Sequence, residues 1–145
     1  MDQDVTVAGP ITVLLHVSSS GSDSDFDVKL IDEYPDSAPS PGYQLLLRGE
    51  PMRARFRNSF SKPEALQPGE VTRISFTMPD VNHTFLRGHR MVVQVQSSWF
   101  PLVDMNPQTF LRIPDAKPTD FIKANQRVFH TPQADSAIVL PILKN

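Results

Sequence analysis

Residues 11–32 read ITVLLHVSSSGSDSDFDVKLID and contain two runs in which apolar and polar side chains alternate. The apolar members are Ile11, Val13, Leu15 and Val17 in the first run and Phe26, Val28 and Leu30 in the second. A period of two predicts strands with one face turned toward a core. The serine, glycine and aspartate residues between the runs are typical of a turn. This stretch therefore predicts two neighbouring strands of an all-β protein.

The same period recurs further along the chain, and we expect about eight strands in all. The further runs are YQLLLRG (43–49), MRARFR (52–57), VTRISFTM (71–78), RMVVQVQSS (90–98), QRVFHT (126–131) and AIVLPIL (137–143). Fourteen prolines, spread from Pro10 to Pro141, leave room for short helices only, at SKPEAL (61–66) and TDFIKAN (119–125). A parallel sheet would need crossover helices, so we predict an antiparallel β-sandwich.

Length and composition favour one compact domain over the whole of residues 1–145. The balance of 14 Lys and Arg against 16 Asp and Glu gives a net charge of -2, which argues against a nucleic-acid partner. The sequence has no apolar run long enough to span a membrane. Its first residues, MDQDVTV, carry acids where a signal peptide would carry positive charge, so we expect no export signal on this chain. It has no cysteine, which excludes disulfides and cysteine-bound zinc and leaves the compartment open. We expect no cofactor.

Five segments, in order and at consistent spacing, resemble a known family. They are SDSDFDVKLIDEYPD (22–36), RGEPMRARFR (48–57), LQPGEVTRISFTMP (66–79), FLRGHRMVVQVQSSWFPLVDMNP (85–107) and NQRVFHTPQADSAIVLPI (125–142). Together they are similar to the C-terminal β-sandwich of the X-prolyl dipeptidyl-peptidase, cocaine esterase and α-amino-acid ester hydrolase family, with which glutaryl-aminocephalosporanic acid acylases are grouped. The stretch PQTFLRIPDAKPTD (107–120) departs from the family pattern.

The resemblance implies a jelly-roll sandwich, similar to galactose-binding domains, that follows an α/β-hydrolase domain with a Ser-Asp-His triad. We therefore expect residues 1–145 to be a non-catalytic C-terminal fragment of a serine peptidase, esterase or acylase, without the catalytic domain. Its expected role is to pack on that domain, to help shape the substrate cleft and, by analogy with the family, to support homo-oligomers. The localisation of the parent stays unknown, since a bacterial enzyme could be cytoplasmic or periplasmic or secreted depending on its N-terminal part.

Catalysis by this chain alone is not expected. The six glycines include no pair four residues apart, so the G-x-S-x-G elbow of α/β-hydrolases is missing. An independent esterase would have to build another triad from His16, His83, His89 or His130. A carbohydrate-binding module is a further alternative, although one tryptophan and two tyrosines make a poor sugar platform.

Asp23, Asp25 and Asp27 stand at alternate positions and are weak candidates for calcium ligands. Calcium takes about six to eight oxygens, and the glycine and distal glutamate of an EF-hand loop are missing here. We favour a turn in which Asp25 and its neighbours bond to backbone amides.

We also predict a structural polar network. Asp32 continues the inward row of Phe26, Val28 and Leu30, and a buried carboxylate without a partner is costly. We expect an arginine of RARFR or Arg90 to pair with it. Arg53, Arg55 and Arg57 are expected to share a solvated strand face. His89 and Arg90 follow Gly88, where they can tie loops together. The predicted network comprises Asp25, Asp32, Arg53, Arg55, His89 and Arg90.

Trp99, Phe100 and Pro101 follow the strand at 90–98 and are the candidate docking surface. A large aromatic side chain at the end of a sandwich contributes strongly either to loop packing or to docking. The sequence does not decide between these two roles.

Overall fold

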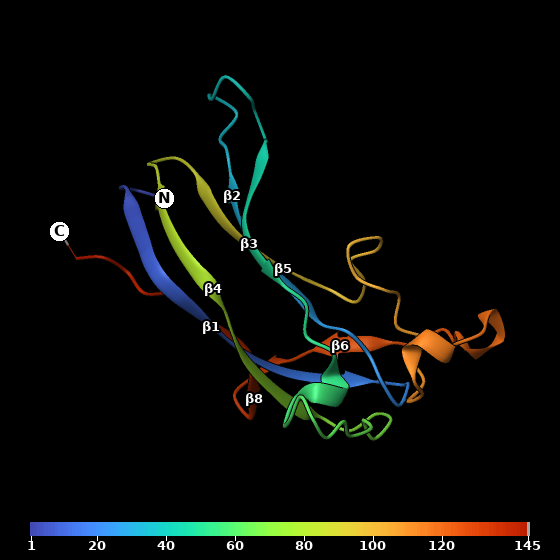
Figure 1. Ribbon diagram of the computed structural model, residues 1–145. Coiled ribbons are helices and arrows are strands. Elements are labelled where there is room, and N and C mark those ends of the chain that lie inside the picture. Colours follow the sequence, from blue (N-terminus) through green and yellow to red (C-terminus); the bar gives the residue numbers. More distant parts are fainter. Residues whose placement is uncertain (145) are drawn as a thin grey trace.

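Two antiparallel sheets make up the structure, a computed structural model that describes residues 1–144 (Figure 1). The strands are β1 Val5–Ser19, β2 Asp27–Glu33, β3 Gln44–Glu50, β4 Thr72–Phe85, β5 Arg90–Gln96, β6 Gln126–Val128, β7 His130–Thr131, β8 Ala134–Asp135 and β9 Ala137–Val139. Three short 3-10 helices connect them, η1 Ala54–Phe56, η2 Ile113–Asp115 and η3 Pro118–Asp120. Within residues 1–144 there is no α-helix, and hence no helix that is long and apolar enough to cross a membrane.

The first sheet, here called the long sheet, has the order β4-β1-β6, and β9 also pairs with β1. The second, the short sheet, has the order β3-β2-β5, and β7 and β8 form a small hairpin. β1 and β4 pair from Val5 to Val17, with a register shift between Gly9 and Ile11. Gly9 has φ +126, a conformation that suits glycine because it has no Cβ.

The hydrophobic core lies between the two sheets. Almost completely buried side chains come from alternate positions of β1 and β4, from β2, and from Phe26 just before β2. They include Val7, Ile11, Val13, Leu15, Val17, Phe26, Val28, Leu30, Ile74, Met78, Val81 and Phe85. The alternation predicted for residues 11–17 and 26–30 is therefore observed, and the prediction of an all-β antiparallel sandwich is confirmed. The finer jelly-roll and galactose-binding labels stay predictions.

Three of the predicted elements differ from the structure. MRARFR is not a strand: Arg53 forms an isolated bridge with Asp25, and Ala54–Phe56 turn into η1. Ion pairs with buried aspartates hold this segment out of both sheets, and these tertiary contacts override its period-two pattern. No helix forms at SKPEAL, and near TDFIKAN the structure has only the short η3.

Candidate functional site

A buried ion pair lies at the turn before β2. Asp23 is completely buried, and its Oδ2 accepts hydrogen bonds from Arg55 Nε at 2.7 Å and from Asn106 Nδ2 at 2.9 Å. Arg55 Nη1 also donates to the carbonyl of Leu111 at 2.6 Å, and the guanidinium lies 5.0 Å from the ring centroid of Phe110. Arg55 therefore ties η1 both to the turn before β2 and to the loop at 106–111.

Asp25 extends the same network. Its Oδ1 accepts a hydrogen bond from Asn106 Nδ2 at 2.7 Å, and its Oδ2 accepts one from Arg53 Nε at 3.3 Å. Arg53 Nη2 donates to the carbonyl of Asp104 at 2.7 Å. Burial raises the pKa of Asp25, against the opposing effect of the Asn106 hydrogen bond. The prediction of a solvated arginine face is thus wrong, since Arg53 and Arg55 form ion pairs with Asp25 and Asp23.

Asp27 is buried without a partner. Its position between Phe26 and Val28 turns its side chain to the outer face of the short sheet, opposite Gln96 of β5. Within residues 1–144, neither of its carboxylate oxygens accepts a hydrogen bond. Burial raises the pKa of Asp27 to about 6, and the negative charge of Asp25 adds to this effect.

The three aspartates do not form a calcium site in this arrangement. Oxygens of Asp23 and Asp25 are already bonded to Arg55, Arg53 and Asn106. In the part of the chain that the structure describes, no group of three or more acidic or histidine side chains is placed to hold a metal ion. The prediction that Asp25 and its neighbours bond to backbone amides is wrong for Asp23 and Asp25, because their bonded carboxylate oxygens accept from side chains. The network joins loops through charge-assisted hydrogen bonds instead.

The prediction that an arginine pairs with Asp32 is wrong. Two histidines donate to this buried carboxylate, His83 from Nε2 and His89 from Nδ1, each at 2.9 Å. Arg90 lies on the outer face, where it pairs with Glu33 at 2.8 Å, because neighbouring residues of β5 point to opposite faces. His83 belongs to β4, so this contact links the two sheets.

Sequence reasoning missed the role of His83, although a signal was available. His83 stands between Val81 and Phe85 in a period of two, and all three side chains turn inward from β4. The rings of His83 and Phe85 pack edge to face, with centroids 4.9 Å apart.

Within residues 1–144, no serine hydroxyl bonds to a histidine ring. The ring of His16 bonds to the carbonyl of Asp135 at 2.9 Å, whereas those of His83 and His89 bond to Asp32. Ser136 Oγ contacts only the backbone of His16. These contacts tie strands together and do not form the Ser-His-acid chain of a hydrolase.

The candidate docking residues divide into two roles. Trp99 is half-buried, and Lys29 Nζ lies 4.1 Å from its ring centroid, which anchors the loop to the outer face of the short sheet. Phe100 is 65% exposed, and Pro101 is exposed beside it. Trp99 therefore packs within the chain, while Phe100 remains available to a partner.

Gly49 gives a test of the Trp99 packing. A Cβ at this position would lie 2.3 Å from Trp99 Cη2, so Gly49→Ala is expected to expel the ring. Trp99 is the only tryptophan, so we expect its fluorescence to shift to the red and stability to fall by about 1 kcal/mol. Ser98→Ala, an exposed change beside the ring, is the control. An unchanged emission spectrum in Gly49→Ala would contradict the packing.

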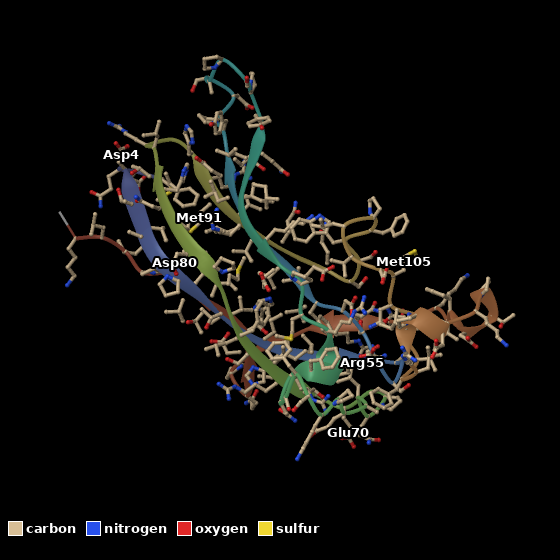
Figure 2. All side chains as sticks on the ribbon, viewed as in Figure 1. Asp4, Arg55, Glu70, Asp80, Met91 and Met105 are labelled. Carbon is tan, nitrogen blue, oxygen red and sulfur yellow. The ribbon has the colours of Figure 1, made fainter. Side chains whose placement is uncertain are left out.

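An exposed apolar surface lies next to Phe100. We call it the docking face and define it as Phe100, Met105, Phe121 and Ile122, which are 40–65% exposed. Two adjoining surface hollows of about 360 and 390 Å³ share Met105 and Phe121 in their walls. Figure 2 shows Met105 on the loop that follows β5, on the same side of the molecule as the segments around η2 and η3.

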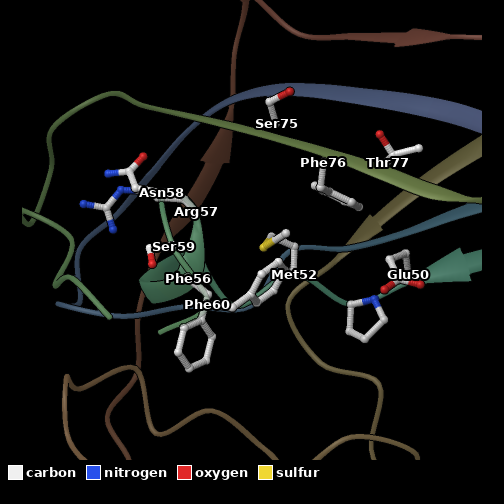
Figure 3. Close-up of a pocket in the computed structure, with 11 residues that line it drawn as sticks. Glu50, Met52, Phe56, Arg57, Asn58, Ser59, Phe60, Ser75, Phe76 and Thr77 are labelled. Atoms are coloured by element: carbon white, nitrogen blue, oxygen red, sulfur yellow. The ribbon is translucent and has the colours of Figure 1, made fainter. Parts of the chain in front are cut away.

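A separate hollow of about 270 Å³ lies between η1 and β4 (Figure 3). Phe56 and Phe60 line it, with ring centroids 6.3 Å apart, and Phe60 is 81% exposed. The Arg57 guanidinium there donates to the carbonyls of Ala54, Glu64 and Ala65. Its donors are thus engaged in holding the loop, and the hollow offers apolar contact rather than an anion site.

Comparison with known proteins finds a matching family model and several similar proteins. The family model described as the X-Pro dipeptidyl-peptidase C-terminal non-catalytic domain matches residues 1–139. The chain is 36% identical over 140 residues to cocaine esterase from Rhodococcus sp. (strain MB1 Bresler). The matched region covers 97% of the chain and 24% of the esterase.

Two solved structures are similar over 99% of the chain. One is an aminopeptidase from the marine sediment archaeon Thaumarchaeota archaeon, with 44% identity and a TM-score of 0.95. The other is an α-amino acid ester hydrolase, with 46% identity and the same TM-score. The chain corresponds to only 24% of each of these proteins.

Proposed function

The chain belongs to the family of X-Pro dipeptidyl-peptidase C-terminal non-catalytic domains, and from that premise we propose that it packs on the α/β-hydrolase domain of a longer enzyme and helps to shape its substrate cleft. The domain is an accessory part of a hydrolase rather than an enzyme in itself. The names of its relatives support a parent that is a serine hydrolase of ester, peptide or amide bonds.

The docking face is the single observation that carries this proposal. Aromatic and long apolar side chains at such exposure form a patch that is expected to associate with another surface. Aromatic anchors contribute most of the energy of many interfaces. Phe100 and Phe121 supply two such anchors on one side of the sandwich.

The buried network supplies the rigidity that such a role requires. Arg53 holds the carbonyl of Asp104, Arg55 holds that of Leu111, and Asn106 bonds to two buried aspartates. These bonds fix the loops that carry the docking face before the partner binds. Preorganised loops lower the entropy lost on association and hold a neighbouring cleft in one shape.

Polar substitution of the docking face tests the proposal. In the parent enzyme, the double variant Phe100→Ser and Met105→Ser is expected to lower kcat/KM at least about tenfold, since central apolar anchors contribute about 2 kcal/mol or more. The isolated 145-residue chain is expected to keep its unfolding temperature. Val71→Ser, an equally exposed position elsewhere, is the control. A parent enzyme unaffected by the double variant would exclude the docking face.

The alternative of a carbohydrate- or calcium-binding module has weaker support. The single tryptophan packs against Gly49 and Lys29, and the aspartates are bonded to arginines. Homo-oligomer formation by this domain stays a prediction.

A further inference from the structure

One side of the sandwich, here called the closed side, is bridged between β3 and β4, and the other, the open side, has a hollow between β5 and the strands β6 and β9. On the closed side, Arg48 of β3 donates through Nε to the carbonyl of Asp80 in β4. On the open side, β5 faces β6 and β9 across a hollow of about 190 Å³. Its apolar lining consists of Leu15, Val93, Val95, Val128, Ala137 and Ile138.

Core burial is incomplete along this open side. Val93 and Leu30 are cross-strand partners on the inner face of the short sheet, yet Val93 is 40% exposed and Leu30 is 1% exposed. The neighbouring inward residues Met91, Val95, Val128 and Ile138 are only partly buried. Inward apolar side chains of both sheets therefore share a surface that nothing in residues 1–144 covers.

The backbone of β5 borders this hollow and is unpaired on that side. β5 bonds to β2 and is the edge strand of the short sheet. Within the described chain, residues 91–96 form no other backbone hydrogen bond. The sequence MVVQVQ at 91–96 has no proline or charge, the usual protection of an exposed edge. An extended strand can satisfy both the free edge and the apolar hollow at once.

We propose that an extended segment of the parent hydrolase, outside residues 1–145, adds as a strand to β5 and inserts alternate apolar side chains into the open side. This inference rests on the proposed function, because it assumes a longer parent enzyme. The relatives have ample chain for such a segment, since residues 1–145 correspond to 24% of their length. A second copy fits less well, because the inward side chains of its own β5 face its own sandwich and would leave the hollow of the first copy unfilled.

Amide hydrogen exchange of the 145-residue chain and of the full parent hydrolase distinguishes this proposal from the proposed function. We expect the amides of residues 91–96 to exchange at least about tenfold more slowly in the parent. If they exchange equally fast in both, the added strand is overturned. Slower exchange at residues 100–105 and 121–122 reports the docking face separately. If neither region is slowed in the parent, the proposed function fails as well.

Val93→Arg provides a second test, with Val139→Arg as its matched control. Both valines are exposed, Val93 at 40% and Val139 at 54%. Val93 faces the open side, whereas Val139 pairs with Thr12 on the other face of the long sheet. In the parent, we expect Val93→Arg to lower the unfolding temperature by about 3 °C or more and Val139→Arg to leave it unchanged. Equal effects of the two variants would overturn the proposal. So would a dimer of the isolated chain with residues 91–96 protected, which would assign the edge to a second copy.

Discussion

Replacing Arg55 with methionine is expected to lower the free energy of unfolding by about 3–5 kcal/mol, because the change leaves the Asp23 carboxylate buried without its counter-ion. Methionine keeps much of the apolar length of the arginine side chain, so the loss reports the charge and its hydrogen bonds. The carbonyl of Leu111 also loses its donor, which frees the loop at 106–111. Urea denaturation of the purified chain at pH 7 measures the change.

Arg112→Met is the matched control for this prediction. Arg112 is 78% exposed and pairs with Asp115, which is 65% exposed, so its loss is expected to cost less than about 1 kcal/mol. Adding Asp23→Asn to Arg55→Met is expected to recover part of the stability, because the uncompensated charge is then removed. Equal stability losses in Arg55→Met and Arg112→Met would contradict the assignment of Arg55 to a buried pair.

Asp27→Asn is expected to raise the stability of the chain above pH 6 by up to about 3 kcal/mol, because the folded protein holds an ionised carboxylate there without a partner. The pKa of Asp27 rises from 3.8 to about 6 on folding, so the folded state binds this proton more tightly than the unfolded state. The stability that protonation contributes is complete below pH 3.8, decreases as the pH rises, and is lost above pH 6.

The test of this prediction is the difference in stability between variant and wild type as a function of pH. We expect the two proteins to be nearly equal at pH 4 and the variant to become more stable between pH 4 and 6. Asp36→Asn, at an exposed position, controls for a general effect of removing a negative charge. A constant difference across the pH range would show that the Asp27 carboxylate is not coupled to folding.

The alternation of apolar and polar residues was sufficient to predict the β-sandwich. Alternation in β1, β2 and β4 requires only that one side of each strand exclude water, and this preference is carried by single residues. The inward position of Asp32 followed from the same rule. The ordered segments that resemble the family gave the accessory role, which no local rule supplies.

The alternation of apolar and polar residues could not predict which side chains pair across the sandwich. Asp32 required a donor, but whether it came from Arg90 or from His83 depended on how the long sheet lies over the short one. MRARFR had the period of a strand, yet the bonds from Arg55 to Asp23 and Leu111 hold it in η1. Trp99 was equally compatible with packing and docking until Gly49 and Lys29 were placed beneath it.

The sequence alone therefore determined the alternation of β1, β2 and β4, the inward position of their apolar side chains and the family to which the chain belongs, because these depend on neighbouring residues and their order. Only the tertiary structure decided which charges meet, which aromatic side chains remain exposed, and which strand edge is unpaired. Such contacts join residues far apart in the chain, and their energies depend on distances and burial that exist only after the two sheets have packed together.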